Sequence, residues 1–283
     1  MKIGIIGIGF VGGTTAEVLK QAHEILPYDP FKEPYKNPDV LKEAEVVFIC
    51  VPTPMKPSGE MDYSAIHNSL MILQEVTKDN PQKPLVILRS TAVSGTTKSL
   101  ENKYSFNCAF NPEFLREKHA LDDMKNTNRI VIGANRPEDY EKVEQVYKPL
   151  FPNAKYIYVN TNTAEMIKYA SNAMLTGQIA LANEIYQICK ATGVNYDLVK
   201  NTLLLDNRIA RNIHVPGHDG DLGFGGKCFP KDLNALIYLA RENHYRPHLL
   251  EEIWRLNEKV RTDKNWLDIP GATSEKGFEN SQS

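Results

Sequence analysis

The sequence predicts an α/β domain followed by an all-helical domain. Short apolar runs alternate with helix-like patterns as far as about residue 160, and one long helix-like pattern follows them. The 283 residues are enough for two domains with a sizeable core. A hydrophobic content of 42% and a charged content of 24% are ordinary for a globular protein.

The first domain consists of apolar runs of strand length that are separated by helix-like segments. This alternation is typical of parallel βαβ units, because a crossover must return the chain to the start of the next strand. The predicted strands cover residues 2–8, 24–29, 44–52, 85–90, 128–133 and 155–160. The predicted helices between them cover residues 14–22, 64–78 and 137–148.

The second domain begins where the strand-like runs end. Residues 161–193 form one helical pattern that Gly193 ends, since glycine readily adopts the left-handed backbone of a helix C-terminus. Shorter helices are predicted at 196–204, 231–242 and 247–262. The end of the chain is polar and aperiodic. We therefore predict a domain over 1–160, a helical domain over 161–265 and a disordered tail over 266–283.

Charge and cysteine content argue against several classes of protein. The net charge of −2, without any Lys/Arg run, argues against nucleic-acid binding. No apolar stretch has the length of about 18 residues that predicts a membrane span, and the N-terminal run reads as a strand rather than a signal peptide. The four cysteines form no CxxC pair, so no metal site or disulfide framework is expected. A reducing cytoplasm is the simplest location.

A glycine pattern near the N-terminus indicates a Rossmann-like dinucleotide-binding domain. Gly7, Gly9 and Gly12 form GxGxxG between the first strand and the first helix, and this context gives a weak pattern its meaning. They would permit the tight turn, the approach of the pyrophosphate and close helix–strand packing. Asp29 ends the next strand and would bond the ribose 2′-hydroxyl, so NAD is favoured over NADP. The alternatives are a turn without a ligand and a surface role for Asp29.

The stretch GFGGKCFPKD, from Gly223 to Asp232, places a thiol just before a helix. Pro230 suits a first helical turn, so Cys228 lies beside a helix N-terminus, whose dipole favours a thiolate. The glycines remove side-chain bulk and would let a substrate approach. Asp232 follows one turn later, where a carboxylate can handle water or protons during covalent chemistry at a carbonyl. The alternative is a buried structural cysteine, which is our interpretation of Cys50, Cys108 and Cys189.

Further polar residues occur at positions suited to chemistry. Lys168 and Asn172 lie one turn apart on the long helix, and a desolvated lysine can act as a base or stabilise an alkoxide. A solvated lysine is the simpler alternative. Thr91 follows the strand at 85–90, at the sheet edge where open α/β folds bind ligands. Glu113 and Glu117 occur in NPEFLREK, and a solvated helix face is the alternative for this pair.

Together these motifs resemble the UDP-glucose/GDP-mannose 6-dehydrogenase family. The segments that match, in the family's order from Met1 to about Val260, are GIGFVG, VPTP with a later Asp62, RSTAVSGTT, NPEFLREK, RIVIG, KYASNAMLTGQIALANEI, VPGHDGDLGFGGKCFPKD and WRLNEKV. The resemblance implies a four-electron oxidation of a nucleotide sugar at C6, with two NAD per substrate. It also implies a homodimer formed through the central helix, at about residues 246–262.

The resemblance implies a role for each matched position. Cys228 would attack the aldehyde intermediate, and the resulting thiohemiacetal would become a thioester that water releases as the carboxylate. The catalytic residues implied are Cys228, Lys168, Asn172, Asp232, Glu113 and Thr91. The cofactor contacts implied are Gly7, Gly9, Phe10, Val11, Gly12, Asp29, Pro52, Thr53, Thr91 and Glu117. The substrate contacts implied are Glu113, Phe114, Leu115, Lys168, Asn172, Arg208, Phe224 and Gly225.

Two departures from the family pattern leave three functions open. The segment at 31–44 is short, so a trimmed adenosine pocket is expected, and the chain stops before the family's second α/β domain. A separate chain would then supply that domain, or the substrate is smaller.

The first function is the nucleotide-sugar dehydrogenase, acting on a UDP- or GDP-sugar. The second is a two-electron β-hydroxyacid dehydrogenase, which also uses a lysine and an asparagine but needs no thiol. The third is an NAD-binding homologue without turnover.

Overall fold

The computed structural model describes residues 1–209 and 212–274, which fall into two compact units. Unit 1 comprises Met1–Thr53 and Tyr63–Lys168, and unit 2 comprises Pro54–Asp62 and the chain from Tyr169 onward. The division therefore lies within helix α6 (Thr161–Thr192), not before it. It also assigns the short segment that follows VPT to unit 2.

Unit 1 is built on a seven-stranded sheet with the order β2-β1-β3-β4-β5-β6-β7. The strands are β1 (Lys2–Ile6), β2 (Glu24–Tyr28), β3 (Val46–Ile49), β4 (Leu85–Leu88), β5 (Cys108–Phe110), β6 (Arg129–Gly133) and β7 (Lys155–Val159). Neighbouring strands are parallel except β5 and β6, which pair antiparallel. The order reverses at β1, so the carboxyl ends of β1 and β3 form the crevice where open α/β sheets bind ligands.

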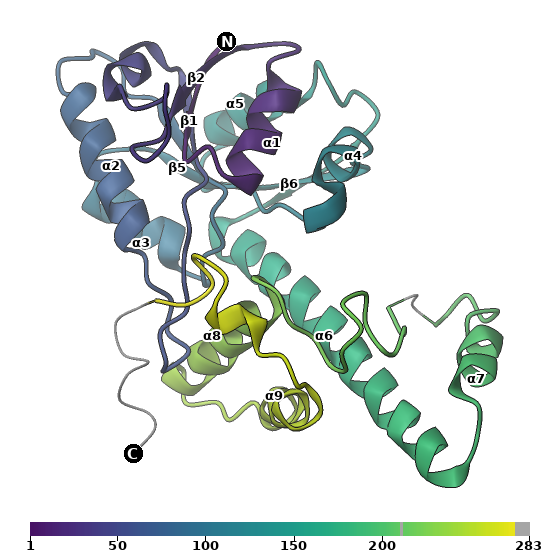
Figure 1. Cartoon of the computed structure of the whole chain (residues 1–283). Helices are drawn as coiled ribbons and strands as arrows, with labels where there is room; N and C mark the ends of the chain where they lie inside the picture. Colours follow the sequence, from purple (N-terminus) through teal and green to yellow (C-terminus); the bar gives the residue numbers. More distant parts are fainter. Residues whose placement is uncertain (210–211, 275–283) are drawn as a thin grey trace. The chain divides into compact units, whose positions relative to one another are not determined.

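Both faces of this sheet are buried, because helices cover each of them. Successive residues of each strand point to opposite faces and therefore enter different cores. Ile6, Val47 and Ile49 belong to the core under α2 (Ser64–Val76) and α3 (Thr96–Lys103). Ile5 and Phe48 belong to the core under α1 (Phe10–Leu19), α4 (Ala120–Lys125) and α5 (Pro137–Tyr147). Figure 1 shows these two groups of helices on opposite sides of the sheet. Short 3-10 turns, η1 (Pro38–Glu43) and η2 (Glu117–His119), complete the unit.

The sequence predicted the strands of this sheet except β5, and it did not predict α3 or α4. Strand β5 has only three residues, which is too short for a recognisable apolar run. It is held by β4 on one side and by a single pair, Phe110 with Gly133, on the other. The predicted α/β class is confirmed.

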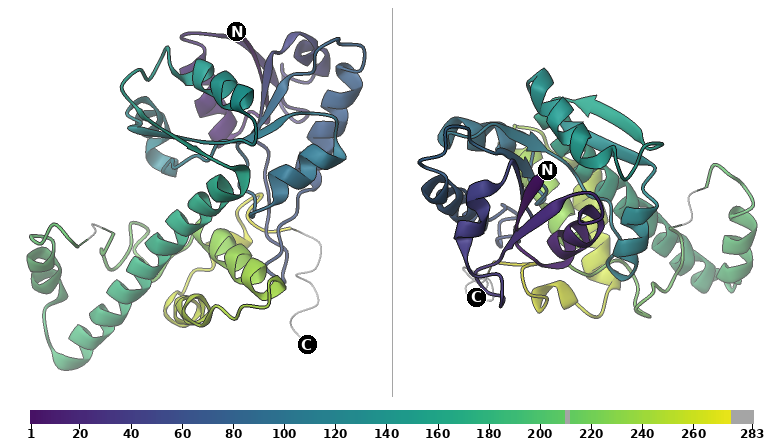
Figure 2. Two further views of the ribbon diagram at one scale, coloured as in Figure 1. Left: turned by 180° about the vertical axis from the view of Figure 1, so that it is seen from behind. Right: turned by 90° about the horizontal axis from the view of Figure 1, so that it is seen from above.

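Unit 2 is helical. Helix α6 is one long, continuous helix (Figure 2). It covers 32 residues and ends at Gly193, whose φ of +71° is the left-handed conformation that the sequence predicted. The helices that follow are α7 (Tyr196–Leu203), α8 (Phe229–Glu242), α9 (His248–Val260) and the 3-10 turn η3 (Asn265–Leu267). One core cluster joins Ala180 of α6, Leu233 of α8 and Ile253 of α9 around Phe224. Within residues 1–209 and 212–274, no helix combines the length and apolar character that a membrane span requires.

Part of the predicted disordered tail is packed. Trp266 is only 3% exposed and its ring meets Trp254 at a centroid distance of 5.5 Å. The backbone N–H of Met55 donates to the carbonyl of Ala272, and that of Ser274 donates to the carbonyl of Met55. Residues 266–274 are therefore packed and not disordered. The sequence could not show this, because Met55 lies more than two hundred positions before its partners Ala272 and Ser274. Residues 275–283 lie outside the described residues.

A carboxylate of α6 caps the N-terminus of α3 within unit 1. The Glu165 side chain accepts the N–H groups of Gly95 and Thr97 at 2.7 Å each and the hydroxyl of Thr97 at 2.6 Å. Glu165 is fully buried. Burial raises the pKa of Glu165 from 4.5 to about 7, although the hydrogen bonds from Thr97 and Gly95 act in the opposite direction. The donors and the burial therefore compete at this site.

This competition predicts a pH dependence of stability. Because the folded carboxyl holds its proton up to about pH 7 and the unfolded one releases it near 4.5, Glu165 should stabilise the fold less as pH rises through this window. The difference in unfolding free energy between wild type and Glu165→Gln, measured by urea titration, should shrink from pH 4.5 to 7. The exposed Glu184→Gln on the same helix is the control and should show no such trend. A difference that grows over the same window would mean that the three hydrogen bonds from Gly95 and Thr97 outweigh burial in setting the pKa of Glu165.

Candidate active site

The turn after β1 has the geometry that close approach of a ligand requires. Gly7 has a φ of +89°, and a Cβ atom there would meet the carbonyl oxygen of Cys50 at 2.9 Å. A Cβ on Gly12 would lie 1.9 Å from the carbonyl oxygen of Gly7, so only glycine fits where α1 crosses the strand end. A Cβ on Gly9 would meet nothing within 4 Å, which leaves the turn open on one side. With α1 starting at Phe10, the arrangement fits a pyrophosphate at a helix N-terminus.

Asp29 lies directly after β2, beside this turn. Its carboxylate accepts the N–H groups of Ile8 at 2.9 Å and Phe31 at 3.0 Å, and it is 8% exposed. A carboxylate has about four acceptor positions, so two backbone donors leave capacity for a ribose hydroxyl. Asp29 is thus a buried part of the turn, unlike the surface residue that was its alternative. Its contact with the ribose stays a prediction.

The ends of β3 and β4 are joined by side chains of the predicted motifs. The Thr53 hydroxyl donates to the carbonyl of Thr91 at 2.9 Å, and the Ser90 hydroxyl donates to the carbonyl of Val51 at 2.7 Å. Thr53 is buried, next to the exposed Pro52. These bonds fix the position of Thr91 relative to VPTP at the carboxyl edge of the sheet.

The buried ion pair of unit 1 joins Lys168 to Glu113. The Lys168 ammonium donates to the Glu113 carboxylate at 2.8 Å and to the Glu113 carbonyl at 2.7 Å, and both residues are less than 10% exposed. The solvated alternatives for these two residues are therefore wrong. Burial alone would raise the pKa of Glu113, but the charge of Lys168, the Leu115 N–H and Arg89 hold it below its ordinary value. Glu113 is consequently ionised.

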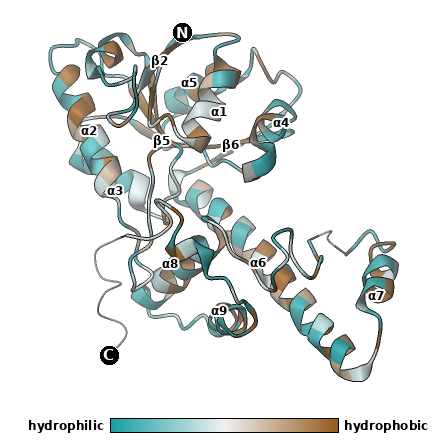
Figure 3. Cartoon of the chain, in the orientation of Figure 1, coloured by the Kyte–Doolittle hydropathy of each residue, from teal (hydrophilic) through white to brown (hydrophobic). Residues whose placement is uncertain are grey.

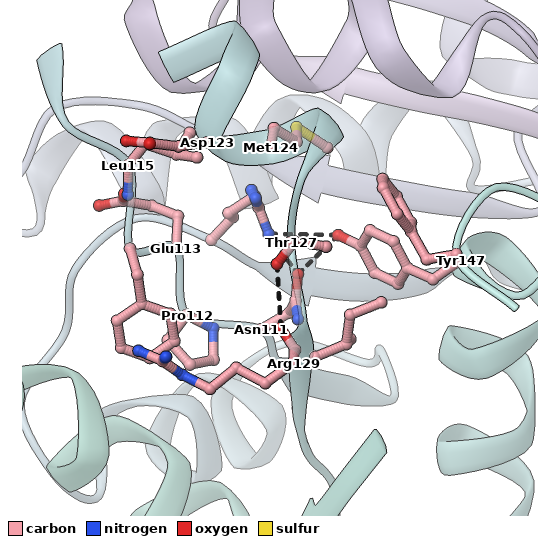
Figure 4. A pocket seen from close by; sticks show the side chains of 13 residues that line it. Asn111, Pro112, Glu113, Leu115, Asp123, Met124, Thr127, Arg129 and Tyr147 are labelled. Atoms are coloured by element: carbon pink, nitrogen blue, oxygen red, sulfur yellow. Dashed lines mark hydrogen bonds between the residues drawn. The ribbon is translucent and has the colours of Figure 1, made fainter. Parts of the chain in front are cut away.

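A second buried network lies beneath the Glu113 loop. The Arg89 guanidinium donates to the side-chain oxygen of Asn111 and to the Tyr147 hydroxyl, and Tyr147 itself donates to Asn111 at 2.6 Å. The Asn111 amide also donates to the carbonyl of Val131 in β6, the strand that pairs with β5 only through Phe110 and Gly133. Figure 4 shows Asn111 and Tyr147 joined along the wall of a small cavity of about 60 Å³ that Glu113 and Leu115 also line. The network therefore supports both loops that carry Thr91 and Glu113, and the sequence did not indicate it.

Aromatic and cationic side chains meet at Phe114. The Arg129 guanidinium lies 4.5 Å from the centre of the Phe114 ring, and the Lys168 ammonium lies 5.7 Å from it. Phe114 thus stabilises two cations at the edge of the Glu113 loop. The side chain of Glu117 lies outside the described residues, so its predicted contact with the cofactor stays a prediction.

In unit 2, Cys228 occupies the N-cap position of α8 and is exposed. Helix α8 begins at Phe229 with Pro230 in its first turn, as the sequence predicted, and the Asp232 N–H donates to the Cys228 carbonyl at 2.8 Å. The other cysteines differ from it. Cys108 and Cys189 are buried, and burial raises the pKa of both Cys50 and Cys108 to about 12. Their structural interpretation agrees with these surroundings.

Asp232 is the centre of a buried polar cluster in unit 2. It is 2% exposed and accepts the Asn172 side-chain amide at 2.5 Å and the Lys231 ammonium at 2.5 Å. The sequence predicted that Asp232 handles water or protons, and the contacts found in unit 2 are to Asn172 and Lys231. Lys231 was missed, although its place between Pro230 and Asp232, on the first turn of a predicted helix, could have singled it out.

Three of the predicted substrate contacts have different surroundings from those expected. The Phe224 ring is 3% exposed and packs against Phe229 and Trp254, so only its backbone could face a sugar. A Cβ on Gly225 would lie 2.4 Å from the Arg261 guanidinium, so this glycine makes room for an arginine. Arg208 is exposed and paired with Asp206 at 2.6 Å. The other predicted contacts in unit 1, Glu113, Phe114 and Leu115, lie together on one loop.

The fold and these sites define a dinucleotide-binding α/β protein with a helical second unit that carries an exposed cysteine at a helix N-terminus. Comparison with known proteins is more specific. Residues 31–151 match the "UDP-glucose/GDP-mannose dehydrogenase family, NAD binding domain", and residues 162–259 match the same family's central domain. The chain belongs to the UDP-glucose/GDP-mannose dehydrogenase family. The predicted resemblance is confirmed. The expectation that NAD is the cofactor is confirmed as well, because the matched domain is the family's NAD-binding domain.

Individual relatives support the same assignment. The UDP-glucose 6-dehydrogenase of Rickettsia felis is 37% identical over 250 residues, which are 86% of this chain and 53% of the relative. That of Haloferax volcanii is 31% identical over 91% of this chain and 70% of its own length. A solved UDP-glucose dehydrogenase from Pyrobaculum islandicum is similar with a TM-score of 0.82 and 28% identity, over 91% of this chain and 68% of that one. The chain thus spans about half to two thirds of the length of such relatives.

One structural neighbour bears on the two-electron alternative. A 3-hydroxyisobutyrate dehydrogenase from Mycobacterium tuberculosis has a TM-score of 0.68 over 93% of this chain, at 16% identity. At that identity the likeness shows the fold alone. The architecture is therefore shared by both types of dehydrogenase, and only the residues of the site discriminate between them.

The glycine turn gives a matched pair of variants. Gly12→Ala should weaken NAD binding strongly and destabilise the fold, because its Cβ would lie 1.9 Å from a backbone oxygen. Gly13→Ala, one residue later, meets nothing within 4 Å and should leave NAD affinity unchanged while stabilising α1 by about 0.5–1 kcal/mol. Calorimetric NAD titration and urea unfolding of both variants measure these effects. Equal NAD affinities for the two variants would refute the assignment of the turn.

Proposed function

We propose that the protein is an NAD-dependent oxidoreductase that oxidises a nucleotide sugar, such as a UDP-glucose-like substrate, at C6 to the uronic acid. The observation that carries this proposal is the exposed Cys228 at the N-cap of α8. A two-electron dehydrogenase has no need of a thiol at this position. The names of the relatives support a UDP-sugar as the first substrate to test. A GDP-sugar is the alternative.

The proposed reaction has three parts. The C6 alcohol loses a hydride to NAD and a proton to give an aldehyde. The Cys228 thiolate adds to the aldehyde carbon, and loss of a second hydride to a second NAD turns this thiohemiacetal into a thioester. Water then attacks the thioester, releasing the carboxylate and restoring the thiol. A thiolate suits the second part, because it forms the covalent bond at a carbonyl and is later a good leaving group.

The polar residues divide the remaining tasks in this proposal. The Lys168 side-chain nitrogen lies 2.8 Å from the Glu113 carboxylate, and this contact favours the role of Lys168 as a stabiliser of the alkoxide over that of a base. Asn172 would donate to the same oxygen from one turn further along α6. Asp232 holds Asn172 in place, and Thr91 with Glu113 would position the hydrolytic water.

The compartment of the protein is a further part of this proposal. A catalytic thiol must stay reduced, which supports a cytoplasmic location.

One assay tests the proposed chemistry. Purified protein with NAD and a panel of UDP- and GDP-sugars should form two NADH per acid released. Cys228→Ser should lose acid formation by about a thousandfold or more, while Cys189→Ser, a change at a buried cysteine, should retain it. One NADH per turnover with full activity of Cys228→Ser would instead favour the two-electron dehydrogenase. NAD binding without turnover on any sugar would favour the idle homologue.

We also propose a homodimer, formed by an apolar face of α6. Met174, Leu181 and Ile188 are 68%, 63% and 55% exposed and recur every seven residues, so they follow one side of the helix. Figure 3 shows apolar turns recurring along α6. The sequence prediction placed the contact at 246–262, the region of α9, where Leu249 is the large exposed apolar side chain. Exposed apolar surface of this kind marks interaction sites, so α6 is the better-supported surface.

Light scattering after size exclusion tests this surface. The wild type should elute as a dimer, and Leu181→Glu should shift it to a monomer with unchanged helical circular dichroism, because a charge cannot be buried unpaired in an apolar contact. Met71→Glu, at an equally exposed methionine on α2, is the control and should remain dimeric. A monomeric wild type at micromolar concentration would overturn the proposal.

A further inference from the structure

The loop that precedes Cys228 is held by the side chains of three asparagines from three elements of unit 2. Asn183 of α6 accepts the N–H of Gly223 at 2.9 Å. Asn257 of α9 accepts the N–H of Phe224 at 2.7 Å and donates to the Phe224 carbonyl at 3.0 Å. Asn265 of η3 accepts the N–H of Gly226 at 2.9 Å. We call Asn183, Asn257 and Asn265 the asparagine clamp.

The orientation of the clamp amides is determined by their partners. Asn257 pairs with both the N–H and the carbonyl of one residue, so exchanging its oxygen and nitrogen would place donor against donor and acceptor against acceptor. The Asn183 amide nitrogen donates to the carbonyl of Ile179, which leaves its oxygen for Gly223. Asn183 and Asn257 are 2% and 1% exposed. Buried backbone groups of an irregular loop need such partners, because no ladder satisfies them.

The glycines of this loop make room for the clamp. A Cβ on Gly223 would lie 2.3 Å from the Asn257 side-chain oxygen, and Gly223 has a φ of +68°. A Cβ on Gly225 would lie 2.6 Å from the Asn265 oxygen. The sequence interpretation, in which the glycines clear a path for the substrate, is therefore incomplete. At these two positions the space beside the glycine is occupied by the side chains that hold the loop.

We propose that the asparagine clamp positions the Cys228 loop, so that Asn183, Asn257 and Asn265 are positioning residues for the thiol chemistry. This inference rests on the proposed function and extends it to three residues that the sequence analysis did not single out. Holding Gly223, Phe224 and Gly226 from three sides restricts the backbone that leads directly into Cys228. A nucleophile fixed near its attack geometry gains much of its rate from this restriction.

The choice of asparagine also has an electrostatic reason. An amide offers both a donor and an acceptor without a charge. A carboxylate at the same position would accept the same N–H but would place a negative charge near the helix end where a thiolate must form, and like charges close together are disfavoured. Asn257→Asp therefore changes the charge and one hydrogen bond with almost no change in size.

Hydrogen exchange read by mass spectrometry tests the clamp without any substrate. Asn257→Ala should speed exchange in the peptide covering 222–228 by roughly fivefold or more, because it removes two hydrogen bonds to Phe224 and one such bond contributes about 1 kcal/mol net. Asn243→Ala is the matched control, because this exposed asparagine donates to a carbonyl of its own helix, α8, at its far end. Asn265→Ala, at a partly exposed position, tests the Gly226 contact if Asn257→Ala fails to fold.

A second readout separates positioning from mere stability. The rate of Cys228 alkylation by iodoacetamide, followed at that peptide from pH 6 to 10, should have its midpoint at higher pH in Asn257→Asp than in wild type or Asn243→Ala. Where turnover is measurable, kcat should fall about tenfold in Asn257→Ala, as for a misplaced reacting group, with the KM for NAD unchanged. Unaltered loop exchange, or faster exchange with unaltered alkylation, overturns the proposal. Absence of turnover would count against the proposed function, and hydrogen exchange and Cys228 alkylation would still test the clamp.

Discussion

The buried ion pair between Lys168 and Glu113 is the interaction on which the arrangement of unit 1 depends. It fastens the first turns of α6 to the loop after β5, a strand of three residues with one pair to β6. Breaking a buried pair by removing one partner typically costs about 3–5 kcal/mol, so neither residue can be changed alone without disturbing the loop. The pair also holds the Lys168 side-chain nitrogen 2.8 Å from the Glu113 carboxylate, whose pKa is lowered.

In each unit, further buried polar side chains hold loops that backbone hydrogen bonds alone do not fix. The network of Arg89, Asn111 and Tyr147 supports the loops from below, and Glu165 caps α3 from the same helix that carries Lys168. In unit 2, Asp232 holds Asn172, and the asparagine clamp holds the loop before Cys228. Thr91, Glu113 and Cys228 therefore lie on or next to irregular backbone that buried polar contacts hold in place, whereas Lys168, Asn172 and Asp232 lie on helices. Loops of this kind are mobile unless such contacts restrain them.

The sequence predicted the parts whose signal is local. The glycine turn, the long helix with its stop at Gly193 and the helix that Pro230 begins follow from spacing and backbone preference. The parts that it missed depend on distant partners. Asn183, Asn257 and Asn265 act on residues 40, 33 and 39 positions away, and an isolated asparagine in a helical pattern reads as a solvated residue. Phe224 was misread for the same reason, since one of the two rings that pack against it, Trp254, comes from α9.

The central claim is that Cys228 forms a covalent bond to the substrate during oxidation. The most direct test mixes the protein with NAD and UDP-glucose or a GDP-sugar, quenches with acid at successive times, and measures the mass of the peptide that carries Cys228. The account predicts a transient increase equal to the mass of the bound acyl group, which decays as acid accumulates. Continued formation of acid while the Cys228 peptide stays unmodified at every time would contradict it.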